Sequence, residues 1–142
     1  MDGLTIPFLG AERTEWQYPF ASLLRAGARL AFGSDWTVST ADPFPQIEVA
    51  VRRVWPENRE AAPFLPNERL TLDEALAAAT VGSAFVNGQD EAGWLGVGRL
   101  ADLVVLDRDI DAADAGPIGD TRVVATMVGG SFVHEVPALE RG

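Results

Sequence analysis

The residues best suited to chemistry in this sequence stand where a short apolar run meets a turn. The apolar residues 30–32 are followed by Gly33, and Asp35 and Trp36 then come just before a turn-rich segment. In parallel α/β proteins, functional groups gather at the carboxyl ends of the strands, because the loops there converge on a crevice. A carboxylate delivered to such an edge can take part in binding or catalysis. Asp35 is therefore the candidate catalytic residue.

Asp35 also has a purely structural interpretation, because an aspartate before a turn often accepts hydrogen bonds from nearby backbone N–H groups. Trp36 likewise has two interpretations: it lines a substrate pocket beside Asp35, or it packs against other apolar groups. For the tryptophans at positions 16, 55 and 94 we expect packing in the core or at an interface. Position alone leaves both questions open.

Other candidate sites are weaker. The chain has one His, no Cys and no Lys, so it cannot supply an imidazole cluster, a thiolate site or a carbamylated lysine, and no zinc-type site within this chain alone is expected. His134 lies within the last predicted strand, where a structural or solvated role is expected. Ser34 lacks the G-x-S-x-G setting of a serine nucleophile. The aspartates at 107, 109, 111, 114 and 120 fail the EF-hand pattern at Ala112 and Ile118, which indicates a solvated loop.

Composition limits the class of protein. The 142 residues fit one domain with one core, and 47% hydrophobic with 23% charged residues is an ordinary globular composition. The net charge of −10 disfavours nucleic acid as a partner. No apolar run is long enough for a membrane span, and the first residues lack the pattern of a signal peptide, so no membrane partner and a cytoplasmic location are expected. The absence of cysteine agrees with that location.

The elements that must position Asp35 are predicted from local patterns. Residues 1–15 show no clear period and are expected to be irregular. Pro19 begins a short helix that ends by Ala26, with Gly27 as its stop. The run over 28–33 then predicts a short strand covered on both faces.

The next predicted helix begins with Asp42 as its cap and Pro43 in its first turn. Apolar residues at steps of three and four mark its buried face, and we expect Glu48 and Arg52 to pair on the solvent-facing side. Residues 55–69, with three prolines, are expected to form a loop. The apolar stripe consists of Phe44, Ile47, Val51 and Val54.

The second half of the chain changes from helix to strand. Thr71 and Glu74 form a capping box at the start of a helix that fades by Gly82, and residues 83–86 add one more turn. Strands are predicted over 100–106, 123–128 and 131–136, the last two joined by a hairpin at Gly129 and Gly130. These strands predict a small antiparallel sheet.

Several phrases of the sequence, in this order, resemble the metal-dependent amidohydrolases of the amidohydrolase-3 type. The likeness extends from about Leu9 to Val136 and departs from the family at Thr37, where such sequences often have proline. The phrases are YPFASLLRAG at 18–27, FGSDW at 32–36, LTLDEAL at 70–76, GRLADLVVLD at 98–107 and VGG at 128–130.

The resemblance implies an α+β fold. Residues 1–95 would be the C-terminal end of the barrel, with the last strand and flanking helices of a (β/α)8 barrel. Residues 96–142 would be the C-terminal part of a small antiparallel β-sandwich. In that family the aspartate after the last strand binds a catalytic metal and handles the proton of the attacking water, which implies the same roles for Asp35 and leaves Trp36 as a substrate-binding candidate.

Two functions follow. The first is the C-terminal portion of a metal-dependent hydrolase that acts on carbon–nitrogen, non-peptide bonds of a small-molecule substrate. The complete enzyme would use a divalent metal, with zinc expected, whereas the isolated chain would be inactive and hold none. The alternative is a non-catalytic fragment or relic domain that folds and self-associates. A homo-oligomer is expected in either case, because an unpaired strand and an uncovered helix stripe favour association.

Overall fold

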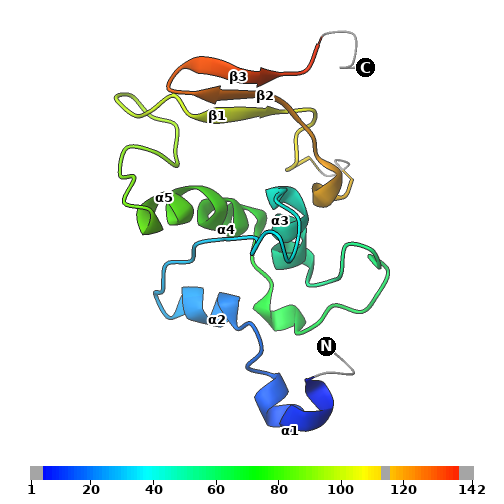
Figure 1. The fold of residues 1–142 in the computed structure, drawn as a ribbon. Helices are drawn as coiled ribbons and strands as arrows, with labels where there is room; N and C mark the ends of the chain where they lie inside the picture. Colours follow the sequence, from blue (N-terminus) through cyan, green and yellow to red (C-terminus); the bar gives the residue numbers. More distant parts are fainter. Residues whose placement is uncertain (1–4, 113–115, 138–142) are drawn as a thin grey trace.

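The computed structural model describes residues 5–112 and 116–137 (Figure 1). A three-stranded sheet lies over a layer that contains helices α3, α4 and α5, and helices α1 and α2 lie on the far side of that layer (Figure 1). This arrangement confirms the α+β class. The barrel and sandwich assignments, and the division at residue 95, remain predictions.

The N-terminal segment differs from the prediction, because it contains helix α1, Ile6–Thr14. Gly10 interrupts this helix with φ 73° and ψ 169°, and no residue of the helix is buried. The prediction of an irregular segment was wrong because a glycine kink and the lack of a buried face remove the periodic signal on which it relied.

Helix α2, Phe20–Arg25, confirms the short helix predicted after Pro19. Its N-terminus is capped from a distant part of the chain. Glu68, in the 3₁₀ turn η1 (Pro66–Glu68), accepts hydrogen bonds from the backbone N–H of Ser22 at 2.9 Å and from its hydroxyl at 2.5 Å. The carboxylate thus satisfies an N–H of the first turn that the helix itself leaves unpaired.

Residues 28–33 do not form the predicted strand. The segment is extended, but in the described part of the chain no strand pairs with it. A strand needs a neighbour to accept and donate its backbone hydrogen bonds. Here the Phe32 N–H donates instead to the carbonyl of Ala78, at 3.0 Å. The apolar pattern identified an extended, partly covered segment but not its pairing partners.

Helix α3, Pro43–Arg52, begins as predicted. The Asp42 carboxylate accepts a hydrogen bond from the Phe44 N–H at 3.0 Å. The predicted stripe faces the interior, where Phe44 and Ile47 join Ala21, Leu70 and Ala75 in the core. The chain itself covers the stripe, so the expectation that an uncovered helix stripe favours association was wrong.

The prediction that Glu48 lies on the solvent-facing side of α3 was wrong, because this residue is fully buried, with 0% exposure. It does approach Arg52, at 3.5 Å, but its closer partners are Arg59, whose Nε lies 2.7 Å from Oε1, and the Gly119 N–H at 2.6 Å. Arg59 also binds Asp120 at 2.8 Å. The 3₁₀ turn η3, Ile118–Asp120, covers this side of α3. The pattern of α3 alone could not predict this, because η3 comes about 70 residues later in the chain.

The capping box is confirmed at the start of helix α4, Leu72–Ala77. The Glu74 N–H donates to the Thr71 hydroxyl at 3.2 Å, and the Thr71 N–H donates to the Glu74 carboxylate at 2.7 Å. The helix continues through a π-helical turn, η2 (Ala78–Gly82), into α5 (Ser83–Val86). The predicted extra turn is therefore present.

The sheet has the order β1–β2–β3, and both pairings are antiparallel. Gly129 and Gly130 adopt φ of 55° and 80° in the predicted hairpin. Strand β1 starts later than expected. The strands are β1 (Leu103–Leu106), β2 (Val123–Val128) and β3 (Ser131–Glu135).

The described aspartates of the loop over residues 107–120, and His134, do not belong to any group of side chains that could hold a metal ion. Asp107 binds Arg108 at 3.2 Å and accepts a hydrogen bond from the Arg122 N–H. His134 is exposed in β3, and Asp114 falls outside the described residues.

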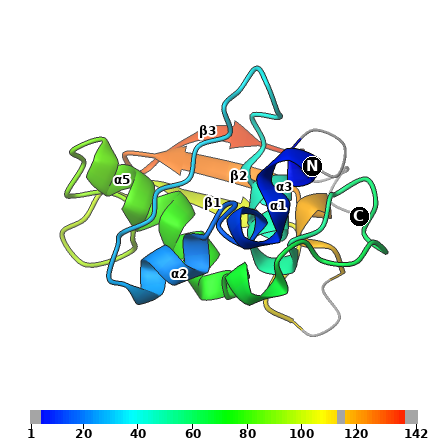
Figure 2. The ribbon, with the colours of Figure 1, turned by 90° about the horizontal axis from the view of Figure 1, so that it is seen from below.

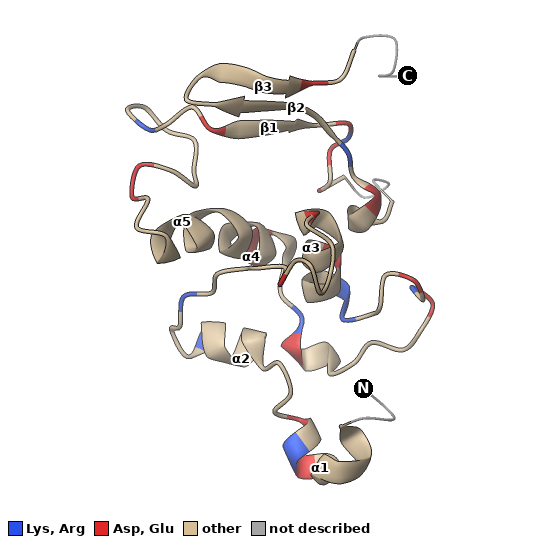
Figure 3. Cartoon of the chain, viewed as in Figure 1, with Lys and Arg blue, Asp and Glu red and all other residues tan. Residues whose placement is uncertain are grey.

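The basic residues are scattered over separate elements (Figure 3). None of the helices in the described ranges is long and apolar enough to span a bilayer.

Candidate functional site

Asp35 lies at the start of the loop that joins the extended segment 28–33 to helix α3. This loop projects away from the helices (Figure 2). Asp35 has a φ of 52°, in the left-handed region that aspartate tolerates better than most residues. The Val38 N–H donates to the Asp35 carbonyl at 2.7 Å, and the Ser39 hydroxyl donates to the Ser34 carbonyl. The backbone of the loop is thus folded on itself, and Asp35 is exposed.

The side chain that accepts a hydrogen bond from a backbone N–H at this turn is that of Ser34, not that of Asp35. The Trp36 N–H donates to the hydroxyl of Ser34 at 3.1 Å. Within residues 5–112 and 116–137, the Asp35 carboxylate has neither a hydrogen bond nor an ion pair. Its oxygens are therefore available to a proton, a cation or a ligand.

Trp36 stands beside Asp35 and is 68% exposed, so it does not pack in the core. Trp16 and Trp55 are 70% and 69% exposed, so of the two expected roles, packing in the core or at an interface, the structure excludes the core for these rings. Trp94 is about half exposed, with the Arg99 guanidinium 4.7 Å from its ring centroid. Packing of these rings at an interface remains a prediction.

The described residues do not complete a metal site by themselves. No three His, Cys, Asp or Glu side chains among them lie together in a way that could hold a metal ion. Catalytic zinc takes three protein ligands, whereas the Asp35 loop offers one free carboxylate, since Asp42 is engaged as a helix cap. The described residues fit the role of contributing one ligand and do not fit the role of holding the metal alone.

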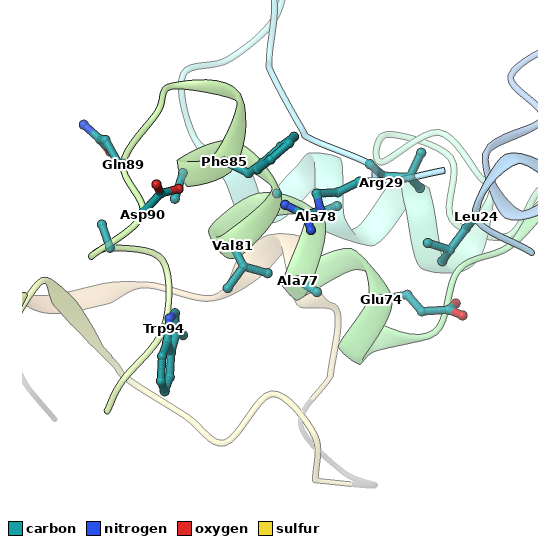
Figure 4. Close-up of a pocket in the computed structure, with 14 residues that line it drawn as sticks. Leu24, Arg29, Glu74, Ala77, Ala78, Val81, Phe85, Gln89, Asp90 and Trp94 are labelled. Atoms are coloured by element: carbon teal, nitrogen blue, oxygen red, sulfur yellow. The ribbon is translucent and has the colours of Figure 1, made fainter. Parts of the chain in front are cut away.

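A separate cleft of about 370 Å³ lies along α4, η2 and α5 (Figure 4). Its lining is largely apolar, and the Arg29 guanidinium rests 3.9 Å from the centroid of the Phe85 ring. Glu74 also borders the cleft, but its carboxylate is engaged in the capping box. Neither Asp35 nor Trp36 lines this cleft. The candidate catalytic residue predicted from the sequence and this cleft therefore lie in different places.

The extended segment beneath Asp35 is attached to the helix that borders the cleft. The Phe32 N–H reaches the Ala78 carbonyl, and the Ser83 hydroxyl lies 3.1 Å from the Phe32 carbonyl. No local sequence pattern predicts these contacts, because they join residues 46 and 51 positions apart and involve mainly backbone groups.

Comparison with known proteins shows where the chain has relatives. The model of the amidohydrolase family matches residues 1–134. Protein LONG AFTER FAR-RED 3 of Arabidopsis thaliana is 37% identical over 136 residues, which are 89% of this chain and 21% of that protein. N-substituted formamide deformylase of Arthrobacter pascens is 35% identical over 119 residues, 83% of this chain and 21% of that protein.

A third relative, the putative amidohydrolase YtcJ of Bacillus subtilis (strain 168), is 28% identical over 128 residues, which cover 89% of this chain and 24% of that protein. The chain thus spans only about a fifth to a quarter of the length of these curated relatives. No solved structure matches it.

Proposed function

Because this chain belongs to the amidohydrolase family, we propose that it is the C-terminal portion of a metal-dependent hydrolase that acts on carbon–nitrogen bonds other than peptide bonds. The family match over residues 1–134 supports a hydrolase, and the greater length of the relatives supports a role as one part of a larger enzyme. The name of the deformylase relative specifies an N-substituted formamide, which is a small molecule with such a bond.

The observation that carries the proposal is the free carboxylate of Asp35. Asp35 is exposed on a loop in which the hydroxyl groups of Ser34 and Ser39 make the hydrogen bonds to the backbone. Within the described residues, the Asp35 carboxylate therefore has no structural role. A carboxylate in this state suits two tasks. It stays ionised beside a cation, and it can accept a proton from a reacting water.

In the complete enzyme, Asp35 would be both a metal ligand and the proton acceptor. A divalent metal, with zinc expected, would supply a water acidified toward neutral pH, and its remaining ligands would come from outside the described residues. Asp35 would hold the metal through one carboxylate oxygen and accept the proton of the reacting water on the carboxylate. Trp36, exposed next to Asp35, would line the substrate pocket. The isolated chain is expected to be inactive and to hold no stoichiometric metal.

Replacing Asp35 in the complete protein tests this proposal. Asp35→Asn should lower turnover of N-formylated amines and related amides by at least about 10²-fold, since the amide cannot accept the proton. Circular dichroism and the unfolding midpoint should be unchanged, because the side chain has no partner to lose. Asp73→Asn, an exposed aspartate in the first turn of α4, is the matched control. Near-normal turnover by Asp35→Asn would contradict the proposal.

The alternative is a non-catalytic domain that folds and self-associates. It is favoured by strand β3, whose five residues are all exposed, including Phe132 and Val133. The coding sequence upstream and in frame distinguishes the two candidates. The enzyme requires a segment there that carries the remaining metal ligands, whereas the self-associating domain does not.

A further inference from the structure

The helical stretch that begins at α4 and ends at α5 contains a π-helical turn, η2, in its middle. Such turns widen the helix locally and are frequent at functional sites. The first residue of this turn, Ala78, uses its carbonyl outside the helix, where it accepts the Phe32 N–H at 3.0 Å. The turn therefore forms a contact with the extended segment that leads to Asp35.

Ser83, just after the π turn, donates to the carbonyl of Phe32, the residue whose N–H binds Ala78. Its hydroxyl lies 3.1 Å from the Phe32 carbonyl and 3.1 Å from the Ala78 carbonyl, so its single proton is shared between two acceptors. Both main-chain polar groups of Phe32 are thus satisfied by the helix. This contact substitutes for the strand pairing that residues 28–33 lack in the described chain.

Gly82 allows the close approach that these hydrogen bonds require. A Cβ atom on this residue would lie 2.0 Å from the Leu30 carbonyl oxygen and 3.1 Å from its carbonyl carbon. The φ of Gly82 is −66°, which any residue adopts, so the need for glycine here comes from the neighbouring backbone and not from conformation. Any side chain at position 82 would push the extended segment away from the helix.

We infer that Gly82 and Ser83 are positioning residues for Asp35, which they influence through the backbone of Phe32. The inference rests on the proposed role of Asp35. Phe32 is only three residues from Asp35, and the loop that starts at Ser34 is folded on itself by hydrogen bonds of Asp35 and Ser34, so a shift at Phe32 moves this loop and with it the carboxylate. Catalytic geometry is sensitive to such shifts, because a displacement of about 1 Å can cost about 10²-fold in rate.

Kinetics of the complete protein test the catalytic part of the inference. Ser83→Ala should lower kcat by about 10- to 100-fold with little change in KM, and Ser83→Thr, which keeps the hydroxyl, should restore most of the rate. Thr80→Ala is the matched control, because it removes a hydroxyl from the same turn that donates only within the helix, to Leu76 at 2.7 Å. That variant should keep the wild-type kcat.

Amide hydrogen exchange of the 142-residue chain tests the contact without any substrate. In both Ser83→Ala and Gly82→Ala the Phe32 amide should exchange at least about tenfold faster, whereas the Ala75 amide, bonded to the Thr71 carbonyl in α4, should be unchanged. Thr80→Ala should leave both amides as in the wild type. Unchanged exchange at Phe32 in both variants would overturn the inference.

The results separate this inference from the proposed function. If Asp35→Asn abolishes turnover while Ser83→Ala keeps the wild-type kcat, the positioning role is wrong and the proposed function stands, even if exchange at Phe32 is faster. Equal losses in Ser83→Ala and Ser83→Thr would also overturn it, because the hydroxyl would then not be the active group. If Asp35→Asn retains turnover, both ideas fail, and the exchange data then describe only how the fold is held.

Discussion

Two carboxylates, Glu48 and Glu68, are buried in the fold, and each is held by groups from a distant segment. A buried charge is tolerated only when it is paired or hydrogen-bonded. Glu48 meets a guanidinium and a backbone N–H, and Glu68 meets the first turn of α2. By contrast, the exposed Asp35 has no such partner in the described residues. This contrast separates structural acidic residues from the candidate catalytic one.

The protonation of Glu68 gives a pH-dependent prediction. Burial disfavours its ionised form, but hydrogen bonds from the Ser22 hydroxyl and N–H outweigh burial, so the pKa of Glu68 lies below its ordinary value. A group with a lowered folded pKa stabilises the protein above its unfolded pKa, about 4.3 for glutamate, and this contribution is lost as the pH falls through the folded value. The wild type should therefore lose stability on acidification below about pH 4.

Glu68→Gln should be less stable than the wild type near neutral pH, and the difference should shrink as the pH falls through that acidic range. Urea unfolding at a series of pH values measures it. Glu57→Gln, at an exposed residue, is the control and should follow the wild-type curve. A difference between Glu68→Gln and wild type that is independent of pH would show that the ionised form is not preferentially stabilised.

At the scale of elements, helices α3 and α4 begin where short polar signals place them. Asp42 caps α3, and the Thr71–Glu74 pair caps α4, through contacts that span two to three residues. The extended segment 28–33 shows the opposite behaviour. Its apolar composition fits a buried strand, but strand formation depends on neighbours, and here a helix backbone supplies the contact instead.

The cap of α4 provides a prediction at this scale. Thr71→Ala removes the hydroxyl that accepts the Glu74 N–H and should lower the free energy of unfolding by about 1 kcal/mol. Thr71→Ser keeps the hydroxyl and should stay close to the wild type. Chemical denaturation monitored by circular dichroism measures both variants. Equal stability of Thr71→Ala and wild type would mean that packing alone fixes the start of the helix.

For the whole molecule, the notable feature is apolar surface that the described chain leaves uncovered. Strand β3 lies at the edge of the sheet (Figure 1), and its five residues are all exposed. Exposed edges of this kind favour pairing with another chain. The net charge of −10 opposes non-specific clumping, so a defined oligomer is expected in preference to an aggregate.

We predict that the chain forms a homodimer or a larger oligomer, with an interface on the scale of about 1,600 Å². Val133→Lys places a charge on the exposed edge and should shift the protein toward monomer. Val38→Lys, which changes an equally apolar, 83% exposed residue in the Asp35 loop, is the control and should keep the assembly. Light scattering across a concentration series measures both. A wild-type monomer that unfolds cooperatively at high concentration would contradict the prediction.

The sequence by itself determined the features that depend on a few neighbouring residues. The caps at Asp42 and Thr71 and the Gly129–Gly130 hairpin are local, since each is fixed by hydrogen bonds or dihedral preferences within about four residues. The family resemblance through FGSDW also pointed to Asp35 as the candidate residue, and the chain belongs to that family.

Only the tertiary structure decided the burial of Glu48, the capping of α2 by Glu68, and the attachment of Phe32 to the π turn. The hydrogen bonds involved join residues 71, 46 and 51 positions apart. No local period encodes such partners, because they are selected by how the segments pack and by which backbone groups would otherwise be left without a hydrogen bond. For the same reason, the sequence pattern could identify Asp35 as a candidate residue but could not predict the contacts that attach the segment before its loop to the helix.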